Sequence, residues 1–229
     1  MTTTIQIFET RKSEIELCYS ILVDLKLEEQ VRGRTLTIDE AHTERFAPIL
    51  KSNILLMLYN LVEACVTTGF VEIYDSIKNN SLSYKELIES IRSIWTNYEI
   101  GRQSLAATAT TITYEKKVQN IISQVISDGA IILTKDALAI SGNLDARAIR
   151  QLLDSHSINI TDRSEKHHVL LVKNKRNALA HGIDSFGEGA RDISINQLAE
   201  IKDEVINFVN SVINYMKSYH DRQDYRIRA

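Results

Sequence analysis

The chain has 229 residues, a net charge of −3, and only eight Gly and one Pro. Its 44% apolar and 25% charged residues exclude wholesale disorder. The scarcity of turn residues excludes β-sandwiches and barrels, and the negative charge excludes a polycation that coats nucleic acid. A compact protein of this size would expose roughly 10,500 Å². We therefore expect one mostly helical domain over residues 1–229.

Cysteine usage and the apolar stretches predict a cytoplasmic protein without membrane contact. Cys18 and Cys65 lie in separate apolar segments, which predicts two buried, reduced thiols. Residues 1–6 have neither the basic nor the apolar region of a secretory signal. The longest apolar stretch, residues 54–62, is interrupted by Asn60 and is too short to span a bilayer.

The first third of the chain predicts three helices. Apolar residues at three- and four-residue steps predict a helix over about residues 8–31. A capping box at Thr37 and Glu40 then predicts a short helix that ends near Pro48. The most apolar segment, residues 49–78, is apolar nearly all round and predicts a helix at the centre of a bundle.

The middle of the chain has a weaker pattern. A capping box predicts a helix over residues 83–98, so that the first group of core helices spans about residues 8–98. Residues 101–162 have the character of an insertion, in which residues 131–133 are compatible with one short strand or a hairpin. Asp145 is expected to cap a short helix that follows it.

Two helices are expected to close the bundle, over about residues 164–219. The first ends at Gly182, which suits the position after a helix. The second begins at Ser194, where Gln197 three residues later completes a capping box. The last residues, 220–229, are expected to fray.

The segment 173–182 carries the most informative polar pattern. At about 100° per residue, Asn174, Asn177 and His181 project from one face of a helix. Arg176 lies about 140° from His181 around that helix, so the two do not stack as an i, i+4 pair. A histidine near a helix end is also explained by capping and by the helix dipole, and spacing alone does not decide.

Three blocks of sequence resemble one family. Arg176 and His181 form the R-x4-H pattern within R-N-A-L-A-H-G, which resembles the HEPN superfamily and its bacterial stand-alone MAE-type branch. The blocks at 56–64 and 142–150 are similar to the same branch, and the resemblance covers roughly residues 45–220. It implies an all-α, HEPN-like antiparallel helical bundle.

The resemblance also implies an activity. HEPN proteins are very often metal-independent ribonucleases, and the resemblance suggests an endoribonuclease of the toxin or antiphage-effector type, restrained by an antitoxin or a neighbouring defence protein. Imidazole exchanges protons near neutral pH, so His181 suits a general base or acid. Arg176 offers a planar fork for phosphate oxygens, and Asn177 either holds the imidazole tautomer or binds a phosphate oxygen. One histidine serves two proton transfers poorly, so the resemblance implies a homodimer with a shared site.

Two further groups of residues are weaker candidates. The first would widen the phosphate-binding edge, and it comprises Lys173, Asn174 and Arg191. A solvated charged face is the alternative reading of these residues. The second would order the motif from the central helix, and it comprises Glu63, Asn60 and Tyr59. A hydrogen-bond network within the core is the alternative for Glu63.

Other chemistry is less well supported. His167 and His168 are adjacent, point about 100° apart on a helix and lack a completing Cys or carboxylate cluster, so we expect no metal and no cofactor. HEPN toxins silenced by adenylylation carry a Tyr two residues after the histidine, where this chain has Ile183, so we do not expect that control. The alternative function is a HEPN-like module that binds nucleotide or RNA, or serves in assembly, without turnover.

Overall fold

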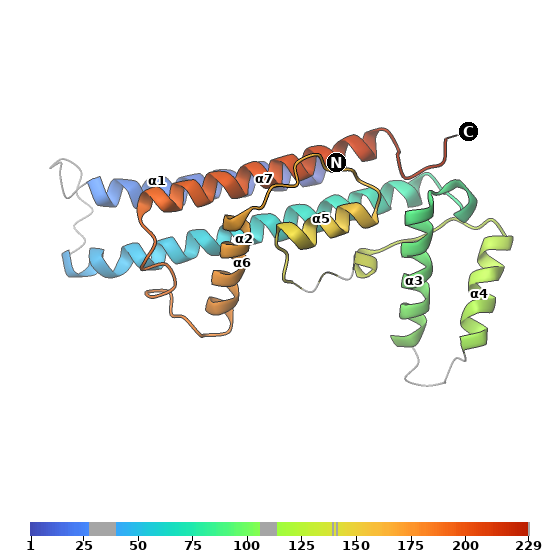
Figure 1. Ribbon diagram of the computed structural model, residues 1–229, viewed down its shortest axis with the longest axis horizontal. Coiled ribbons are helices and arrows are strands. Elements are labelled where there is room, and N and C mark those ends of the chain that lie inside the picture. Colours follow the sequence, from blue (N-terminus) through green and yellow to red (C-terminus); the bar gives the residue numbers. More distant parts are fainter. Residues whose placement is uncertain (28–39, 106–113, 139, 141, 229) are drawn as a thin grey trace.

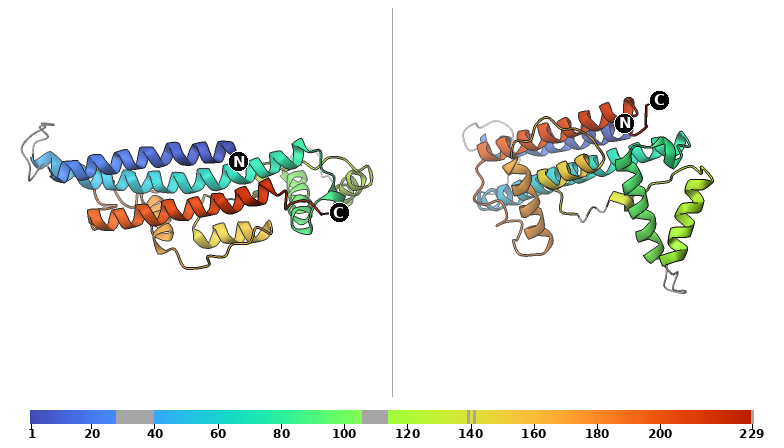
Figure 2. Two further views of the ribbon diagram at one scale, coloured as in Figure 1. Left: turned by 90° about the horizontal axis from the view of Figure 1, so that it is seen from above. Right: turned by 45° about the vertical axis from the view of Figure 1, so that its right-hand side comes forward.

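The computed structural model describes residues 1–27, 40–105, 114–138, 140 and 142–228 (Figure 1). Three long helices lie side by side along its longest axis, namely α1 (Thr2–Leu27), α2 (Glu40–Asn79) and α7 (Ile195–Asp221). α1 runs antiparallel to α2, whereas α7 runs in the same direction as α2 (Figure 2). The shorter helices are α3 (Glu89–Leu105), α4 (Tyr114–Ile126), α5 (Ala146–Ser155) and α6 (His167–Ala180). The expected all-α fold is confirmed.

α2 is the central helix of the bundle, as its composition predicts. It packs against α1, α6 and α7, and its buried side chains include Leu55, Leu58, Leu61, Val62, Val66 and Phe70. By length and composition alone its segment Arg45–Asn79 is apolar enough to cross a membrane, and more than half of its most apolar window is buried. Neighbours on several sides account for that composition, because a central helix has no polar face to present to solvent.

Both N-terminal helices extend beyond their predicted limits. α1 begins at Thr2 because Glu72 of α2 accepts hydrogen bonds from the amides of Thr3 (3.0 Å) and Thr4 (3.1 Å), replacing a local cap. Burial would raise the pKa of the Glu72 carboxyl, but these hydrogen bonds lower it below its usual value. The predicted break at Pro48 is wrong, because α2 runs through it. The missing hydrogen bond costs about 3 kcal/mol, which the packing of a long helix offsets.

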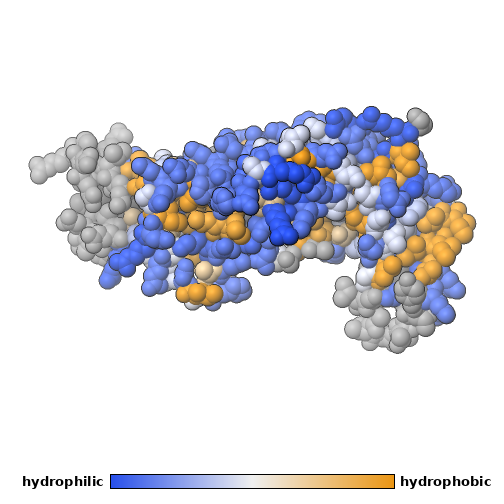
Figure 3. Space-filling view, in the orientation of Figure 1, coloured by the Kyte–Doolittle hydropathy of each residue, from blue (hydrophilic) through white to orange (hydrophobic). Residues whose placement is uncertain are grey.

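The region expected to be an insertion is mostly helical. The predicted strand at 131–133 is wrong, since the described residues there make only one isolated bridge, between Ser83 and Ala130. α3 and α4 form a hairpin that projects from one end of the bundle, and exposed Ile122 and Ile126 give α4 an apolar strip (Figure 3). The chain exposes 13252 Å², more than the compact-globule expectation, because this shape is elongated.

The C-terminal tail does not fray as predicted. Tyr225 is fully buried, and its hydroxyl lies 2.8 Å from the Ser76 hydroxyl. The Ile88 amide donates to the Tyr225 carbonyl at 3.0 Å, and the Ile227 amide donates to the Glu86 carbonyl at 2.8 Å. The tail is therefore bound to the turn that precedes α3 by contacts that its own sequence pattern does not predict.

The thiols and the predicted caps have mixed outcomes. Cys65 is buried, which raises its thiol pKa to about 12, but Cys18 is only partly buried. Asp145 caps α5 by accepting from the Ala148 amide, and Ser194 caps α7 with the predicted capping box. These two caps are confirmed, because their signals are local in sequence. The capping box at Ser83 is present but opens the 3-10 turn Tyr84–Glu86, so α3 begins only at Glu89, and the predicted box at Thr37 lies outside the described residues.

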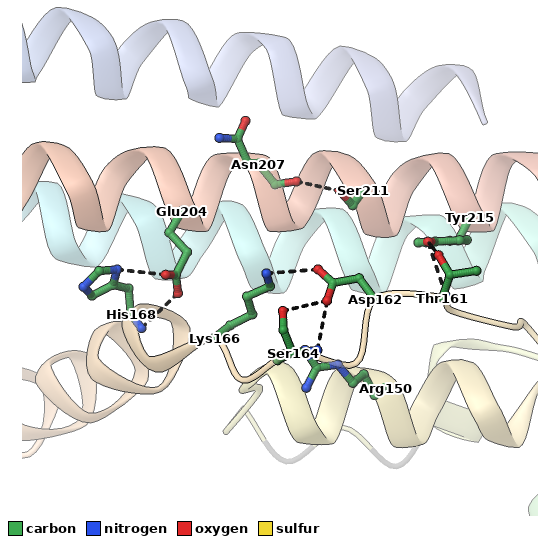
Figure 4. A network of polar contacts seen from close by, with 10 residues as sticks. All are labelled: Arg150, Thr161, Asp162, Ser164, Lys166, His168, Glu204, Asn207, Ser211 and Tyr215. Atoms are coloured by element: carbon green, nitrogen blue, oxygen red, sulfur yellow. Dashed lines mark hydrogen bonds and ion pairs between the residues drawn. The ribbon is translucent and has the colours of Figure 1, made fainter.

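The linker between α5 and α6 is fixed to α7 by polar contacts (Figure 4). Thr161 bonds Tyr215 of α7, and Asp162 accepts from the Ser164 amide at 2.9 Å. His168 places its Nδ1 3.1 Å from a Glu204 carboxylate oxygen, and its amide donates to the other oxygen at 3.1 Å. The start of α6 is thereby anchored on α7, three residues later than the predicted start at Ser164.

Candidate functional site

The C-terminal end of α6 is built to expose His181. Gly182 has a φ of +67°, and the Ile183 amide donates to the Ala178 carbonyl at 2.9 Å. The Gly182 amide donates to the Leu179 carbonyl, so the pattern is a Schellman motif with glycine in the left-handed position. His181 is the last residue before this turn, and its side chain is exposed.

Arg176 lies partly buried between α6 and α2. Its guanidinium carbon is 4.8 Å from the centre of the Tyr59 ring, and its Nη1 donates to Asn177 Oδ1 at 2.9 Å. A guanidinium over an aromatic face gains about 0.5–2 kcal/mol, depending on its solvation. The arginine is therefore held by its flat face and by one of its five N–H groups.

The turn between residues 142 and 145 completes this arrangement. Tyr59 donates its hydroxyl to the Gly142 carbonyl and accepts from the Leu144 amide at 3.2 Å. Asn143 in the same turn accepts from Asn177 Nδ2 at 2.7 Å. We call Tyr59, Asn143, Arg176 and Asn177 the motif network, because their contacts form a closed circuit. Burial raises the pKa of the Tyr59 phenol, so it stays protonated as a hydrogen-bond donor.

A comparison with protein-family models identifies the family of the chain that carries this network. The model of the MAE_28990-like HEPN family matches residues 1–225. The chain belongs to this HEPN family. Searches of curated proteins and of solved structures returned no match. The family resemblance is thus confirmed over more of the chain than the three blocks indicated, and it points to a nuclease or another RNA-related role.

The HEPN motif does not use Asn177 in the way that helical spacing predicts. Its amide oxygen accepts from Arg176 and its amide nitrogen donates to Asn143, and among the described residues no hydrogen bond joins its side chain to His181. The His181 amide donates to the Asn177 carbonyl at 3.0 Å, but its side chain makes no hydrogen bond or ion pair to any residue within the described ranges. Its imidazole is therefore open to solvent and to any ligand that approaches the end of α6.

The residues proposed to widen the phosphate-binding edge differ in their surroundings. Lys173 Nζ lies 2.7 Å from Asp145 Oδ2, so this lysine forms an ion pair with the residue that caps α5. Burial would raise the pKa of the Asp145 carboxyl, but the hydrogen bonds from Lys173 and Ala148 hold it below its usual value. Asn174 and Arg191 are exposed.

The structure separates the three candidates on α2. Tyr59 belongs to the motif network, whereas Glu63 and Asn60 make no hydrogen bond to it among the described residues. The backbone carbonyl of Asn60 instead accepts a hydrogen bond from Arg11 Nη1 at 2.9 Å. Sequence reasoning missed Asn143, although the block at 142–150 that resembles HEPN proteins contained the signal. In the described part of the chain, no three His, Cys, Asp or Glu residues gather to hold a metal.

Proposed function

We propose that this HEPN domain is a metal-independent endoribonuclease. The observation that carries the proposal is the pairing, on one helix, of a guanidinium clamped by Tyr59 and Asn177 with an exposed imidazole at His181. A clamped guanidinium is preorganised for phosphate oxygens, and preorganised charge is a large source of catalysis. RNA is the polymer whose 2′-hydroxyl makes phosphate attack possible without a metal.

The chemistry follows from these two groups. A histidine takes the proton of the 2′-hydroxyl, the 2′-oxygen bonds to phosphorus, and the bond from phosphorus to the 5′-oxygen breaks. Arg176 neutralises the charge that collects on the phosphate oxygens. A second acid gives a proton to the leaving 5′-oxygen. The products are a 2′,3′-cyclic phosphate and a 5′-hydroxyl.

The second proton transfer is assigned to His181 of a second copy, within a homodimer. The exposed position of His181 supports this assignment, and so does apolar surface beyond the end of α6 (Figure 3). Ile183 is 76% exposed and Phe186 is 39% exposed there, which favours contact with another protein. An antitoxin or a neighbouring defence protein is the restraint proposed for such an effector.

The end chemistry of digested RNA tests the activity. Purified protein is incubated with RNA in excess chelator, and the fragment ends are analysed by mass spectrometry. We expect cyclic-phosphate and 5′-hydroxyl ends, with no loss of rate from the chelator. Fragments with 5′-phosphate ends contradict the mechanism. Intact RNA that nevertheless binds the protein identifies the non-catalytic module instead.

Removal of the Asn143 amide tests the motif network. Asn143→Ala frees one end of Asn177 and loosens Arg176, so we expect kcat/KM for RNA to fall about 10-fold, because catalytic groups must be held in place. The melting temperature should change little, since Asn143 is exposed. Asn97→Ala, an exposed position on α3, is the matched control and should cleave like the wild type. Equal rates for the two variants would show that Arg176 needs no such support.

A further inference from the structure

A polar groove runs along α2 beside the motif network. Its larger part has a volume of about 430 Å³ and is lined by Arg11, Asn60, Glu63, Ala64, Thr67, Thr68 and Lys135. We call this part the Glu63 pocket. An adjoining pocket shares Arg11 and Asn60 and continues between α1 and α2. The Glu63 pocket thus combines a carboxylate, an amide and two hydroxyls, with a cation from α1 and another from the turn at Lys135–Leu138.

The carboxylate of this pocket lacks a partner. Glu63 is partly buried, and no donor or cation of the described residues bonds it. Arg11 instead donates one of its N–H groups to the Asn60 carbonyl. Lys135 is exposed and makes no ion pair within the described ranges. Partly buried polar groups normally find partners. This carboxylate therefore suits a ligand that brings N–H donors to it.

The Glu63 pocket is related to the motif network through α2, which carries both Glu63 and Tyr59. Glu63 follows Tyr59 by four residues on α2, so the two lie on one face about one helical turn apart. Both the Glu63 carboxylate and the Arg176 guanidinium act on the Tyr59 phenol, the first raising and the second lowering its pKa. A phosphate at Arg176 would therefore place a neighbouring base within reach of Glu63.

We propose that the Glu63 pocket binds a guanine base of the RNA, next to the phosphate that is cleaved. This inference rests on the proposed ribonuclease function and adds a sequence preference to it. Guanine presents N1–H and N2–H₂ side by side, and these two donors match the two oxygens of a carboxylate. The other three bases flank their donor with an acceptor, which a carboxylate repels. Arg11 and Lys135 suit the adjoining phosphates, which position RNA without specifying sequence.

Cleavage-site sequencing tests the preference. We expect wild-type cuts in a random-sequence RNA to show guanine at one fixed position. Glu63→Gln replaces one acceptor with a donor and should reduce that preference about 10-fold, because a bidentate contact contributes about that much discrimination. Asp75→Asn, an exposed carboxylate further along α2, is the matched control and should keep the preference. Cuts without a guanine preference, or an unchanged preference in Glu63→Gln, overturn the proposal.

Nucleotide binding separates this proposal from the ribonuclease proposal. Titration calorimetry with 5′-GMP should give saturable binding, with 5′-IMP and 5′-AMP at least about 10-fold weaker because they lack one or both donors. Glu63→Gln should lose the difference, and Asp75→Asn should keep it. GMP selectivity without RNA cleavage sustains the pocket and overturns the nuclease. Cleavage with equal affinity for the three nucleotides sustains the nuclease and overturns the pocket.

Discussion

Arg176→Ala will lower kcat/KM for RNA by about 10³-fold, because it removes the guanidinium that we propose binds the reacting phosphate. Arg176→Lys will recover little of this loss, since an ammonium has neither the planar fork nor the stacked contact with Tyr59. The loss of that stacked contact should cost about 0.5–2 kcal/mol of folding free energy. The fold should therefore persist, and circular dichroism with thermal melting checks this beside the cleavage assay.

His181→Ala should cause a loss of the same order, and the double variant should be no worse than either single one, because the residues act as a unit. Arg228→Ala is the matched control, as this exposed arginine lies in the C-terminal tail, at the far end of the bundle from α6 (Figure 1). Cleavage that survives both motif changes in metal-free buffer would rule out the mechanism.

Acidification will destabilise the fold through one buried histidine. His156 is 2% exposed, with its Nε2 2.7 Å from the Tyr74 hydroxyl and its Nδ1 2.7 Å from the Leu152 carbonyl. The Nδ1–H donates to that carbonyl, so Nε2 accepts from Tyr74 and the ring is neutral. Its ring centre lies 4.3 Å from that of Phe70. Burial lowers the pKa of His156 to about 4, from 6.5 in the unfolded chain.

The direction of this pH effect on stability follows from which state of the chain binds the proton. Below pH 6.5 the unfolded chain binds a proton at this residue, and the folded chain does not until about pH 4. The stability contribution is complete above pH 6.5 and is lost as the pH falls towards 4. We expect the free energy of unfolding, measured in urea, to fall by about 2 kcal/mol between pH 8 and pH 5.

Two measurements isolate His156. His156→Gln should remove this part of the pH dependence, whereas His167→Gln, at an exposed position, should retain it. NMR titration of the imidazoles in the wild-type protein measures the pKa of His156 directly, without a substitution that could unfold the chain. An imidazole midpoint near 6.5 for His156 in the folded protein would contradict the prediction.

Local signals in the sequence were sufficient for much of the fold. Asp145, Gly182 and Ser194 mark helix ends within a few residues of themselves, and the structure places each where its signal indicates. The errors arise where the deciding partner is distant in the chain. The start of α1 depends on Glu72, and the order of the tail depends on the burial of Tyr225. No local pattern contains those contacts.

The same distinction applies to the site. Helical spacing and the R-x4-H pattern single out Arg176 and His181 without a structure. The engagement of Asn177 by Asn143 requires two segments to meet in space, so spacing on one helix, which allowed Asn177 either to hold the His181 imidazole or to bind a phosphate oxygen, could not indicate this contact. The ion pair between Lys173 and Asp145 likewise joins two segments that are distant in the sequence, so spacing on one helix could not indicate it.

The closed circuit around Arg176 also bears on the timing of assembly during synthesis. Its members come from the second, third and last quarters of the sequence, and α7 anchors the helix that carries the arginine. A nascent chain cannot complete and anchor the circuit until α5, α6 and α7 have all left the ribosome. The activity proposed for Arg176 therefore requires that the chain has been synthesised through α7.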